Sequence, residues 1–463
     1  MKIKELIKGD PGFQYVIDSM EFMSSAGRRR TLDTLFSTDP DELEAEWHRL
    51  DEAIRATREY KYKKPYIDLR HCLMQLHDLQ GTLTSLANHT TLNEVELFEI
   101  KNLSQLNHVA QGAIDGLGLA DMLPLPDTSE PFALLDPDHT GIANFYIYDS
   151  YDIRLTPLRR ELQALQTSGG DPQRISDLLV EQSEIQTQVC QHLSDELHPW
   201  TKTLTTAMEQ LAYADSLLAK ADLAITWELC RPTIGDNTSY TALFNPRLKQ
   251  RNESTGLRYQ PVDIDLCRGV SLVTGANMAG KTVLLKSVGT AQLMAQCGMF
   301  VPASNAVVKL VEGVATSIGD DQDEMNGLSS YASEIIKISN ILAACRSQEL
   351  LVLIDEPART TNPTEGKALV QAIVKILDSL PSSTLITTHY GQLGVQCRRL
   401  RVKGFVEDLS DLPLNPQNIN HFIDYSLTEE QTDSVPHEAL RIASILGCDT
   451  EMISLAKEKV NEG

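Results

Sequence analysis

A glycine-rich segment holds the residues whose types and spacing are best suited to chemistry. Gly275 and Gly280 enclose four residues and are followed by Lys281 and Thr282. Glycine lets a backbone curl so that several N–H groups face one anion at the start of a helix. A lysine placed here reaches the outer phosphates of a nucleotide, and a threonine hydroxyl joins the magnesium shell. The spacing therefore predicts a site for a nucleoside triphosphate with Mg²⁺.

The flanking sequence separates a phosphate-binding loop from a glycine-rich turn that matches by chance. An apolar run, Val270–Thr274, precedes the loop, and a helix-like segment, Val283–Met294, follows it. A strand, a loop and a helix in this order are the context that phosphate binding requires. We expect nucleotide contacts from Gly275, Ala276, Asn277, Met278, Ala279, Gly280, Lys281, Thr282 and Val283.

Two adjacent carboxylates, Asp355 and Glu356, end a second apolar run, Leu350–Ile354. A buried strand would deliver Asp355 rigidly to the magnesium ion, and Glu356 could polarise the water that attacks the γ-phosphorus. An acidic pair that caps a helix is the structural alternative. Because the pair follows a phosphate loop, we interpret Asp355 as a metal ligand and Glu356 as a catalytic residue alongside Lys281.

Two further segments carry candidate polar groups. His389 ends the run Leu385–Thr388, where a histidine can sense the γ-phosphate; a packed or capping histidine is the alternative. Ser329 lies at the start of a helix-like segment after an acidic loop, and hydroxyls at a helix start bind anions, although a plain helix cap fits equally well. The polar loop 357–362 suits a contact between subunits.

Strands alternating with helices must position these residues. From about residue 236 to residue 425, β-like runs alternate with helical patterns, which favours an α/β domain with a mainly parallel sheet. The expected strands are Val270–Thr274, Gly313–Ser317, Leu350–Ile354, Ser383–Thr388, Val402–Glu407 and His421–Ser426.

The first 235 residues are predicted to be mostly helical. Leucines spaced by three and four over 155–165 are typical of an amphipathic helix, and Gly169-Gly170 interrupts that pattern before a second helix that runs to about His198. Two helices joined by this turn predict an extended antiparallel hairpin. Other expected elements are a helix over 202–227, short extended pieces at Phe132–Leu135 and Tyr146–Tyr151, and a tail of two helices broken at Gly447.

Composition bounds the classes of function. A chain of 463 residues is expected to form two or three domains, and no apolar run approaches the length of a membrane span. Eight scattered cysteines without a Cys-x-x-Cys pair indicate reduced thiols in the cytoplasm. A net charge of −23 counts against DNA binding without excluding it. The densest basic clusters, at 28–30, 61–64 and 398–403, are interpreted as solvated faces or structural pairs.

Together these segments resemble the MutS family, the ATPases best known from DNA mismatch repair. Residues 274–282 resemble T-G-P-N-M-x-G-K-[ST], with Ala276 at the usual proline, and residues 298–303 match G-x-[FY]-V-P-A. Further matches are 327–335 to G-x-S-T-F-M-x-E-M, 355–366 to D-E-x-x-R-G-T-x-x-x-[DE]-G with Thr360 at a glycine, and 388–390 to T-H-[YF]. Residues 23–30 and 92–100 show weaker matches to the family's helical core.

The resemblance implies an α-helical core and lever domain over 1–235, an ABC-type P-loop ATPase domain over 236–435, and a C-terminal helical dimerisation segment over 436–463. It implies hydrolysis of Mg²⁺-ATP in composite sites, in which Ser329 contacts the nucleotide bound by the partner subunit. The partner is then a second copy or a related paralogous subunit.

Departures from the family pattern leave two functions open. We expect the mismatch-reading and connector domains to be absent, and the turn at Gly169-Gly170 leaves no room for a DNA clamp. Leu257 stands where the family has an adenine-stacking aromatic, and Tyr259 is the candidate substitute. The first function is a DNA-associated ATPase acting in repair. The second is an ATP-driven factor that reactivates a client enzyme, such as a cobalamin-dependent lysine or ornithine aminomutase.

Overall fold

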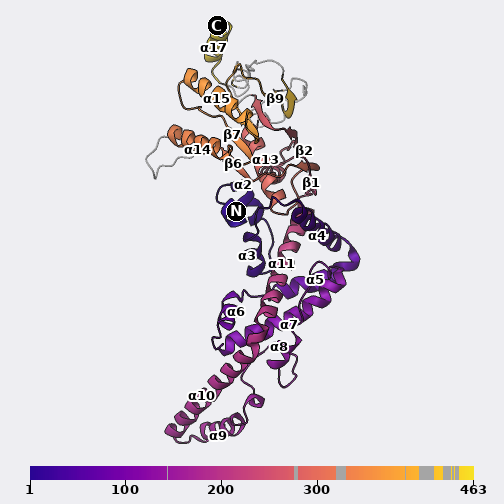
Figure 1. Ribbon diagram of the computed structural model, residues 1–463, viewed down its shortest axis with the longest axis vertical. Coiled ribbons are helices and arrows are strands. Elements are labelled where there is room, and N and C mark those ends of the chain that lie inside the picture. Colours follow the sequence, from indigo (N-terminus) through magenta and orange to yellow (C-terminus); the bar gives the residue numbers. More distant parts are fainter. Residues whose placement is uncertain are drawn as a thin grey trace. The chain divides into compact units, whose positions relative to one another are not determined.

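The computed structural model describes residues 1–142, 144–275, 280–319, 330–391, 393–405, 422–430, 440, 443 and 448–462. The chain forms two compact units (Figure 1). The α/β unit comprises residues 1–19, 35–47 and 224–463, and the helical unit comprises residues 20–34 and 48–223. Two N-terminal segments thus pack with the C-terminal part of the chain. The functional boundary at residue 235 stays a prediction.

Helices account for most of the first 226 residues. Helix α7 is capped at Asn93, whose side chain accepts hydrogen bonds from two backbone N–H groups, and it ends before Gly118, which is in the left-handed conformation. The helices are α1 Ile3–Leu6, α2 Pro11–Asp18, α3 Ser25–Leu32, α4 Pro40–Arg58, η1 Tyr60–Tyr62, α5 Lys63–Leu73, α6 Gln80–Ala87, α7 Glu94–Leu117, α8 Ser129–Leu134, η2 Asp149–Tyr151, α9 Leu155–Ser168, α10 Pro172–Leu197, η3 His198–Trp200 and α11 Thr201–Thr226.

The predicted helical hairpin is formed by α9 and α10. Gly169, with φ of 69°, ends α9, and Asp171 caps α10, which has Pro172 at its first position. Leu158 of α9 and Ile185 of α10 are among the buried apolar residues of the pair. The hairpin is asymmetric, since α9 has 14 residues and α10 has 26.

The two short extended pieces expected before the hairpin are wrong. Residues 129–134 form α8, and the described part of 135–154 holds no strand, only η2. A buried lysine explains the second difference. Lys101 of α7 donates hydrogen bonds to the carbonyl of Asn144 (2.9 Å) and the hydroxyl of Tyr148 (3.1 Å), and it pairs with Asp136 (3.0 Å). These side-chain bonds replace the strand partner that an extended segment would need.

A six-stranded sheet organises the α/β unit, in the order β10-β9-β4-β8-β7-β6. Its pairs are parallel except for β10 with β9, so the expectation of a mainly parallel sheet is confirmed. The strands are β4 Gly269–Thr274, β6 Gly313–Ser317, β7 Leu350–Asp355, β8 Ser383–Thr387, β9 Arg398–Phe405 and β10 Ile423–Glu429. Each expected strand is present within a few residues. His421 and the end expected at Glu407 lie outside the described residues.

A second, four-stranded sheet was not predicted; three of its strands precede β4 in the sequence, and the fourth lies between β4 and β6. Its order is β1-β5-β2-β3, formed by β1 Thr233–Ile234, β2 Thr238–Leu243, β3 Val262–Leu266 and β5 Asn305–Val308. Only β1 and β5 pair in parallel. Short strands with polar residues on one face show little apolar signal along the chain, which explains why they escaped the sequence pattern.

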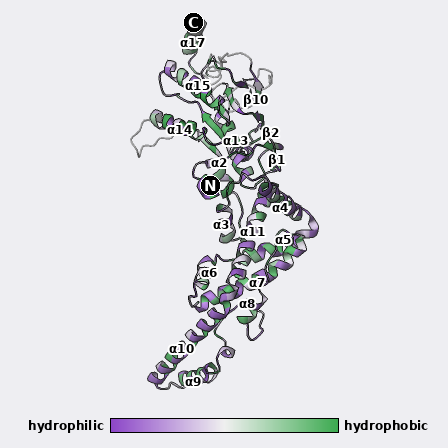
Figure 2. Cartoon of the chain, in the orientation of Figure 1, coloured by the Kyte–Doolittle hydropathy of each residue, from purple (hydrophilic) through white to green (hydrophobic). Residues whose placement is uncertain are grey.

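Helices cover both faces of the six-stranded sheet. Val352 and Ile354 of β7 belong to a core with α14 Ser330–Ala344 and α15 Pro363–Asp378. On the opposite face α13 Lys281–Gln296 packs on β7, where Gly289 lies against Leu353. The apolar residues in Figure 2 gather accordingly in the strands and in α13. Residues that follow the strands are therefore held by a rigid, doubly covered layer.

Further helices in the described part of the α/β unit are the N-terminal α1 and α2, α12 Pro246–Ser254, and α17 Thr450–Glu462 in the predicted C-terminal pair. Most of the first helix of that pair lies outside the described residues. Within the described part of the chain, no helix is both long and apolar enough to cross a membrane.

Candidate functional site

The carboxyl ends of three neighbouring strands bring the candidate residues together. Strand β8 lies between β4 and β7, and all three run in parallel. The register pairs Thr387 of β8 with Val273 on one side and with Asp355 on the other. Because parallel strands end at the same edge of a sheet, the segments that follow them share one site.

The phosphate loop joins β4 to α13. Gly275 and Gly280 have φ of 145° and 73°, a region that side chains disfavour, so glycine is required at both ends of the loop. The helix begins at Lys281, whose buried side chain donates a hydrogen bond to the carbonyl of Gly275 (2.7 Å). Lys281 is thereby folded over the loop. Ala276, Asn277, Met278 and Ala279 lie outside the described residues.

Thr282 and Asp355 meet at the first turn of α13. The Thr282 hydroxyl donates to Asp355 Oδ2 (2.6 Å), and the Thr387 hydroxyl donates to Asp355 Oδ1 (2.6 Å). The carboxylate is therefore held on both oxygens. Thr387 was missed by the sequence analysis, although its position at the end of a predicted strand beside Asp355 was a usable signal.

The pair formed by Thr282 and Asp355 fits magnesium chemically. Mg²⁺ prefers hard oxygen ligands and is held by few protein groups together with phosphate oxygens and water. Adjacent ligands of an octahedral magnesium ion lie about 3 Å apart, close to the 2.6 Å between these oxygens. Among the described residues, no group of three or more His, Cys, Asp and Glu side chains forms a metal cluster.

Glu356 follows directly after β7 and faces three cationic or titratable groups. Its carboxylate lies 3.2 Å from Lys281 Nζ, 3.8 Å from His389 Nδ1 and 3.9 Å from a guanidinium nitrogen of Arg359. Its backbone has φ of 45°, and its N–H donates to the carbonyl (3.1 Å) and the hydroxyl (3.0 Å) of Thr387. A side chain in this left-handed region costs about 1–3 kcal/mol, and such strain gathers at functional sites.

His389 lies beside Glu356, and 37% of its side chain is exposed. Burial lowers the pKa of His389 below its ordinary value. The negative charge of Glu356 opposes this, whereas Lys281 and Arg359 lower it further. The imidazole is therefore neutral at neutral pH and can both donate and accept a hydrogen bond.

A cavity of about 220 Å³ opens beside the phosphate loop. Its lining is mostly aromatic, apolar and amide side chains, with one arginine and one serine: Leu243, Leu248, Asn252, Arg258, Tyr259, Gln260, Val262, Gly280, Val283, Leu284, Ser287, Val402, Tyr425 and Leu427. Val283, expected at the nucleotide, lies in this wall. Leu257 is not among the lining residues, whereas Tyr259 is.

Tyr425 of β10 is the second aromatic residue of this cavity and was missed by the sequence analysis. Its ring would lie 3.1 Å from a Cβ atom at Gly280, so it covers the end of the phosphate loop. Gln260 fixes it, because the Gln260 amide accepts from the Tyr425 N–H (3.2 Å) and donates to Asp424 (2.8 Å). The fold thus brings Tyr259 and Tyr425 to one cavity, although Gln260, next to Tyr259, lies 165 positions before Tyr425 in the sequence.

Ser329, expected to act on the partner's nucleotide, lies outside the described residues. The described part of the helix it would begin, α14, starts at Ser330. Of the polar loop 357–362, Arg359 is half-exposed and approaches Glu356, while Ala358 is fully buried.

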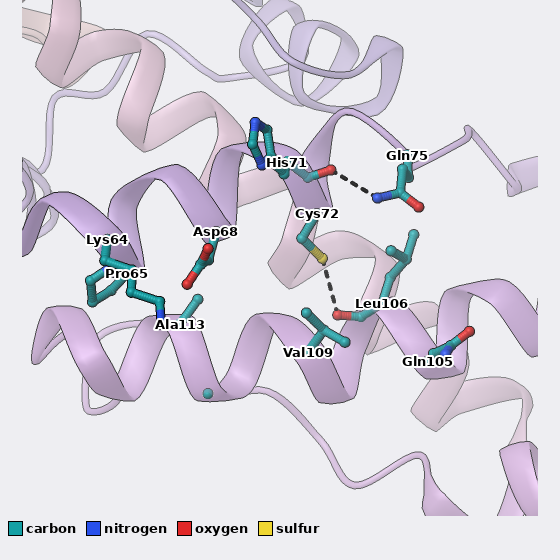
Figure 3. A pocket seen from close by; sticks show the side chains of 11 residues that line it. Lys64, Pro65, Asp68, His71, Cys72, Gln75, Gln105, Leu106, Val109 and Ala113 are labelled. Atoms are coloured by element: carbon teal, nitrogen blue, oxygen red, sulfur yellow. Dashed lines mark hydrogen bonds between the residues drawn. The ribbon is translucent and has the colours of Figure 1, made fainter. Parts of the chain in front are cut away.

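The helical unit holds a larger groove, of about 560 Å³, between α5 and α7. Figure 3 shows Asp68, His71 and Cys72 from the first wall, with Leu106 and Val109 across from them. The Cys72 thiol donates to the carbonyl of Leu106 (3.2 Å), and burial raises the pKa of this thiol to about 11. A thiol in this state is a poor nucleophile, so the groove lacks the chemistry found beside the phosphate loop.

Comparison with known proteins agrees with this geometry. A family model described as MutS domain V matches residues 271–462, which contain the phosphate loop, both carboxylates and His389. The DNA mismatch repair protein MutS of Thermus aquaticus is 33% identical over 192 residues, covering 42% of this chain and 23% of that protein.

Two relatives named Endonuclease MutS2 match a similar region. The protein of Gemmatimonas aurantiaca is 33% identical over 223 residues, covering 48% of this chain and 27% of its own length. The protein of Geobacillus thermodenitrificans is 34% identical over 216 residues, with 46% and 27% covered. The matched region thus spans about a quarter of each of these relatives.

Proposed function

Since the chain belongs to the MutS family through its domain V, residues 271–462, we propose that it hydrolyses ATP to ADP and phosphate with Mg²⁺. One observation carries this proposal. At the shared edge of the sheet, Lys281 Nζ lies 3.2 Å from Glu356, and Thr282 lies 2.6 Å from Asp355. A phosphate-binding cation, a metal pair and a candidate base therefore converge on one point.

Binding uses the phosphate loop and the neighbouring cavity. The triphosphate lies across the loop from Gly275 to Thr282, with Lys281 on its outer phosphates. Lys281 is already folded toward Glu356, so nucleotide binding replaces its bond to the Gly275 carbonyl with bonds to phosphate. The adenine enters the cavity between Tyr259 and Tyr425, where aromatic stacking supports binding.

Hydrolysis is assigned to the residues around Glu356. Thr282 and Asp355 would hold Mg²⁺, which neutralises charge that develops on the phosphates. Glu356 accepts a proton from the attacking water, because its rigid position after β7 points the carboxylate toward Lys281 and the outer phosphate. Neutral His389 hydrogen-bonds the γ-phosphate or the water, which gives it the sensor role expected from the sequence.

A pair of substitutions tests the ATPase proposal. Glu356→Gln should retain ATP binding and lose turnover, since the amide cannot accept the proton. Lys281→Ala should lose tight nucleotide binding. Phosphate release and fluorescent-nucleotide titration measure the two properties, with Glu184→Gln, at an exposed residue of α10, as the matched control. Undiminished hydrolysis by Glu356→Gln would remove Glu356 from the mechanism.

We further propose a dimer with composite sites, in which Ser329 contacts the nucleotide of the partner and residues 436–463 contribute to association. The partner is a second copy or a paralogous subunit. The family match supports this arrangement, because it extends through the tail to residue 462. Light scattering of Glu356→Gln with saturating ATP tests it. A protein that stays monomeric under these conditions contradicts the composite site, and Ser329→Ala should weaken the ATP-dependent association.

DNA is the first candidate partner. One relative is named a DNA mismatch repair protein and others are named endonucleases, which supports a role in DNA repair. A gel shift with mismatched and branched duplexes over a salt series tests this role, because phosphate contacts strengthen as salt falls. No binding even at low salt would exclude it.

A protein client is the second candidate, and the charge of one part of the helical unit, residues 71–200, favours it; the basic clusters at 28–30 and 61–64 lie in the same unit outside this part. Residues 71–200 contain 19 Asp and Glu and only five Lys and Arg. Four of those five cations are ion-paired: Lys101 with Asp136, Arg154 with Asp152, Arg159 with Asp149 and Arg174 with Glu161. This region therefore offers almost no uncompensated positive charge to a phosphate backbone.

The two partners can be separated with one trapped variant. Glu356→Gln with ATP would be used to capture partners from a lysate before and after nuclease treatment. Recovery of one enzyme, such as a cobalamin-dependent aminomutase, independent of nucleic acid supports the client. Recovery that disappears after nuclease treatment supports DNA.

A further inference from the structure

We propose that Glu334 and Tyr390 are positioning residues for Glu356, and that they act by clamping the backbone of Ala358. The inference rests on the proposed ATPase function and deepens it, because it assigns two residues that hold the candidate base in place. Neither residue touches the phosphate loop in the contacts described above. Their effect on hydrolysis would pass through the short segment Glu356–Ala358.

Both polar backbone groups of Ala358 are bound by side chains from separate elements. The Ala358 N–H donates to Glu334 Oε1 (3.0 Å), and the Tyr390 hydroxyl donates to the Ala358 carbonyl (3.0 Å). Glu334 belongs to α14, whereas Tyr390 follows β8. Ala358 is completely buried, so the loss of either bond would leave a polar group without water to replace the partner.

The clamped segment has an unfavourable backbone conformation that needs support. Glu356 has φ of 45° and Ala358 has φ of 60°, so two residues with side chains occupy the left-handed region within three positions. Such conformations persist only where the surrounding structure determines them. Thr387 holds the segment at the Glu356 N–H, and Glu334 and Tyr390 hold it two residues later. The direction of the Glu356 carboxylate is therefore set at both ends.

Gly366 of α15 makes room for this clamp. A Cβ atom at this position would overlap the Tyr390 hydroxyl and lie 3.0 Å from the Ala358 carbonyl oxygen. Gly366 has no positive φ, so its backbone conformation does not require glycine. The requirement for a small residue comes from the close approach of Tyr390 and Ala358. Gly366→Ala should thus open the clamp without changing any side chain that takes part in it.

Tyr390 keeps its proton under ordinary conditions. Burial raises the pKa of Tyr390, and the charge of Glu334 raises it further. The phenol therefore remains a hydrogen-bond donor to the Ala358 carbonyl across the neutral pH range. The Glu334 carboxylate thus accepts from the Ala358 N–H, and the neutral Tyr390 phenol donates to the Ala358 carbonyl.

The geometry distinguishes positioning from nucleotide binding. Displacement of a base by a fraction of an ångström reduces the rate of the chemical step, while the phosphate loop continues to bind ATP. The clamp variants should therefore lower kcat and leave KM nearly unchanged. The conservative variant Glu334→Gln keeps an oxygen acceptor and should retain most activity, whereas Glu334→Ala removes it.

The experiment compares Glu334→Ala, Glu334→Gln, Tyr390→Phe and Gly366→Ala, with exposed Ser339→Ala of the same helix as the control. We expect Glu334→Ala, Tyr390→Phe and Gly366→Ala to lower kcat about tenfold with KM within about twofold of the wild type. Hydrogen exchange of the peptide that contains Ala358 should become faster in the same three variants, measured without nucleotide.

The outcomes separate this proposal from the proposed function. Absence of ATPase activity in the wild-type protein contradicts the proposed function, and hydrogen exchange then still tests the clamp. Faster exchange with unchanged kcat shows that the bonds hold the loop without positioning Glu356, and overturns the inference. Unchanged exchange in all three variants does the same, as does a Glu334→Gln variant that is as impaired as Glu334→Ala. Thermal unfolding identifies any variant that has lost its fold. The remaining variants of the clamp then carry the test.

Discussion

The hydroxyl of Thr282 donates a hydrogen bond to Asp355 (2.6 Å), although 73 positions separate them in the sequence. Thr282 lies in the first turn of α13 and Asp355 ends β7, so the bond links the phosphate loop to the second half of the site. Thr387 holds the other carboxylate oxygen. The sheet thus holds both oxygens of Asp355, and the proposed metal pair of Thr282 and Asp355 can be tested one residue at a time.

Removal of the Thr282 hydroxyl should weaken magnesium use. Thr282→Val preserves shape and removes the oxygen, so we expect the Mg²⁺ concentration for half-maximal hydrolysis to rise about tenfold or more, since mutation at a metal site costs 10–100-fold. Thr282→Ser keeps the oxygen and serves as the control. Hydrolysis measured over a Mg²⁺ series provides the comparison. Equal curves for the valine and serine variants would show that Thr282 is not a ligand.

The aromatic wall should contribute to nucleotide affinity. Tyr259→Ala and Tyr425→Ala should each raise the Kd for ATP about tenfold, because an aromatic stacking contact contributes roughly 1–3 kcal/mol. Leu257→Ala should leave the Kd nearly unchanged, since Leu257 does not line the cavity. Titration with a fluorescent nucleotide measures all three. A larger loss for Leu257 than for Tyr259 would place the adenine elsewhere.

The titration of His389 should affect stability at mildly acidic pH. Its pKa is lowered in the folded protein, so the unfolded chain binds a proton first as the pH falls below about 6.5. The folded state then loses stability as pH falls through this range, and the loss ends once the folded histidine is also protonated. His389→Gln should flatten this part of the profile. Denaturant unfolding at several pH values measures it, and an identical slope in both proteins would contradict the assignment.

The buried pair of Lys101 and Asp136 should be a main support of the helical unit. Burial raises the pKa of the Asp136 carboxyl. Hydrogen bonds from Thr140 and Gly141, together with Lys101, outweigh this effect and lower the pKa of Asp136 to about 2. Its contribution is present above the unfolded pKa and is lost as the pH falls from about 4 to 2. Lys101→Met leaves Asp136 buried without its cation and should destabilise the unit by about 3–5 kcal/mol.

Urea unfolding of Lys101→Met, monitored by the circular dichroism signal of the helices, measures that effect. Arg174→Met removes an exposed ion pair with Glu161 and is the matched control, expected to cost less than about 1 kcal/mol. Equal destabilisation by the two substitutions would show that burial of Lys101 contributes nothing.

The strands that carry the site could be predicted because they are buried. Leu350–Ile354 is a continuous apolar run, which is typical of parallel strands covered by helices on both faces, and Ser383–Thr387 is likewise buried along its whole length. The hairpin of α9 and α10 was equally accessible, since leucine spacing and the Gly169 turn lie within one continuous segment. The four-stranded sheet was missed because its strands are short and mix polar with apolar residues, so their sequence pattern does not differ from that of loops.

What the sequence by itself determined is the local chemistry: a glycine-framed loop before a helix, two carboxylates after a strand, and a histidine after another. Each depends on neighbours within a few positions, and local spacing records such neighbours directly. Only the tertiary structure decided that Tyr425 covers Gly280, that Thr387 supports Asp355, and that Glu334 and Tyr390 meet at Ala358. These contacts join segments from different strands and helices, whose proximity arises from strand order and helix packing and not from distance along the chain.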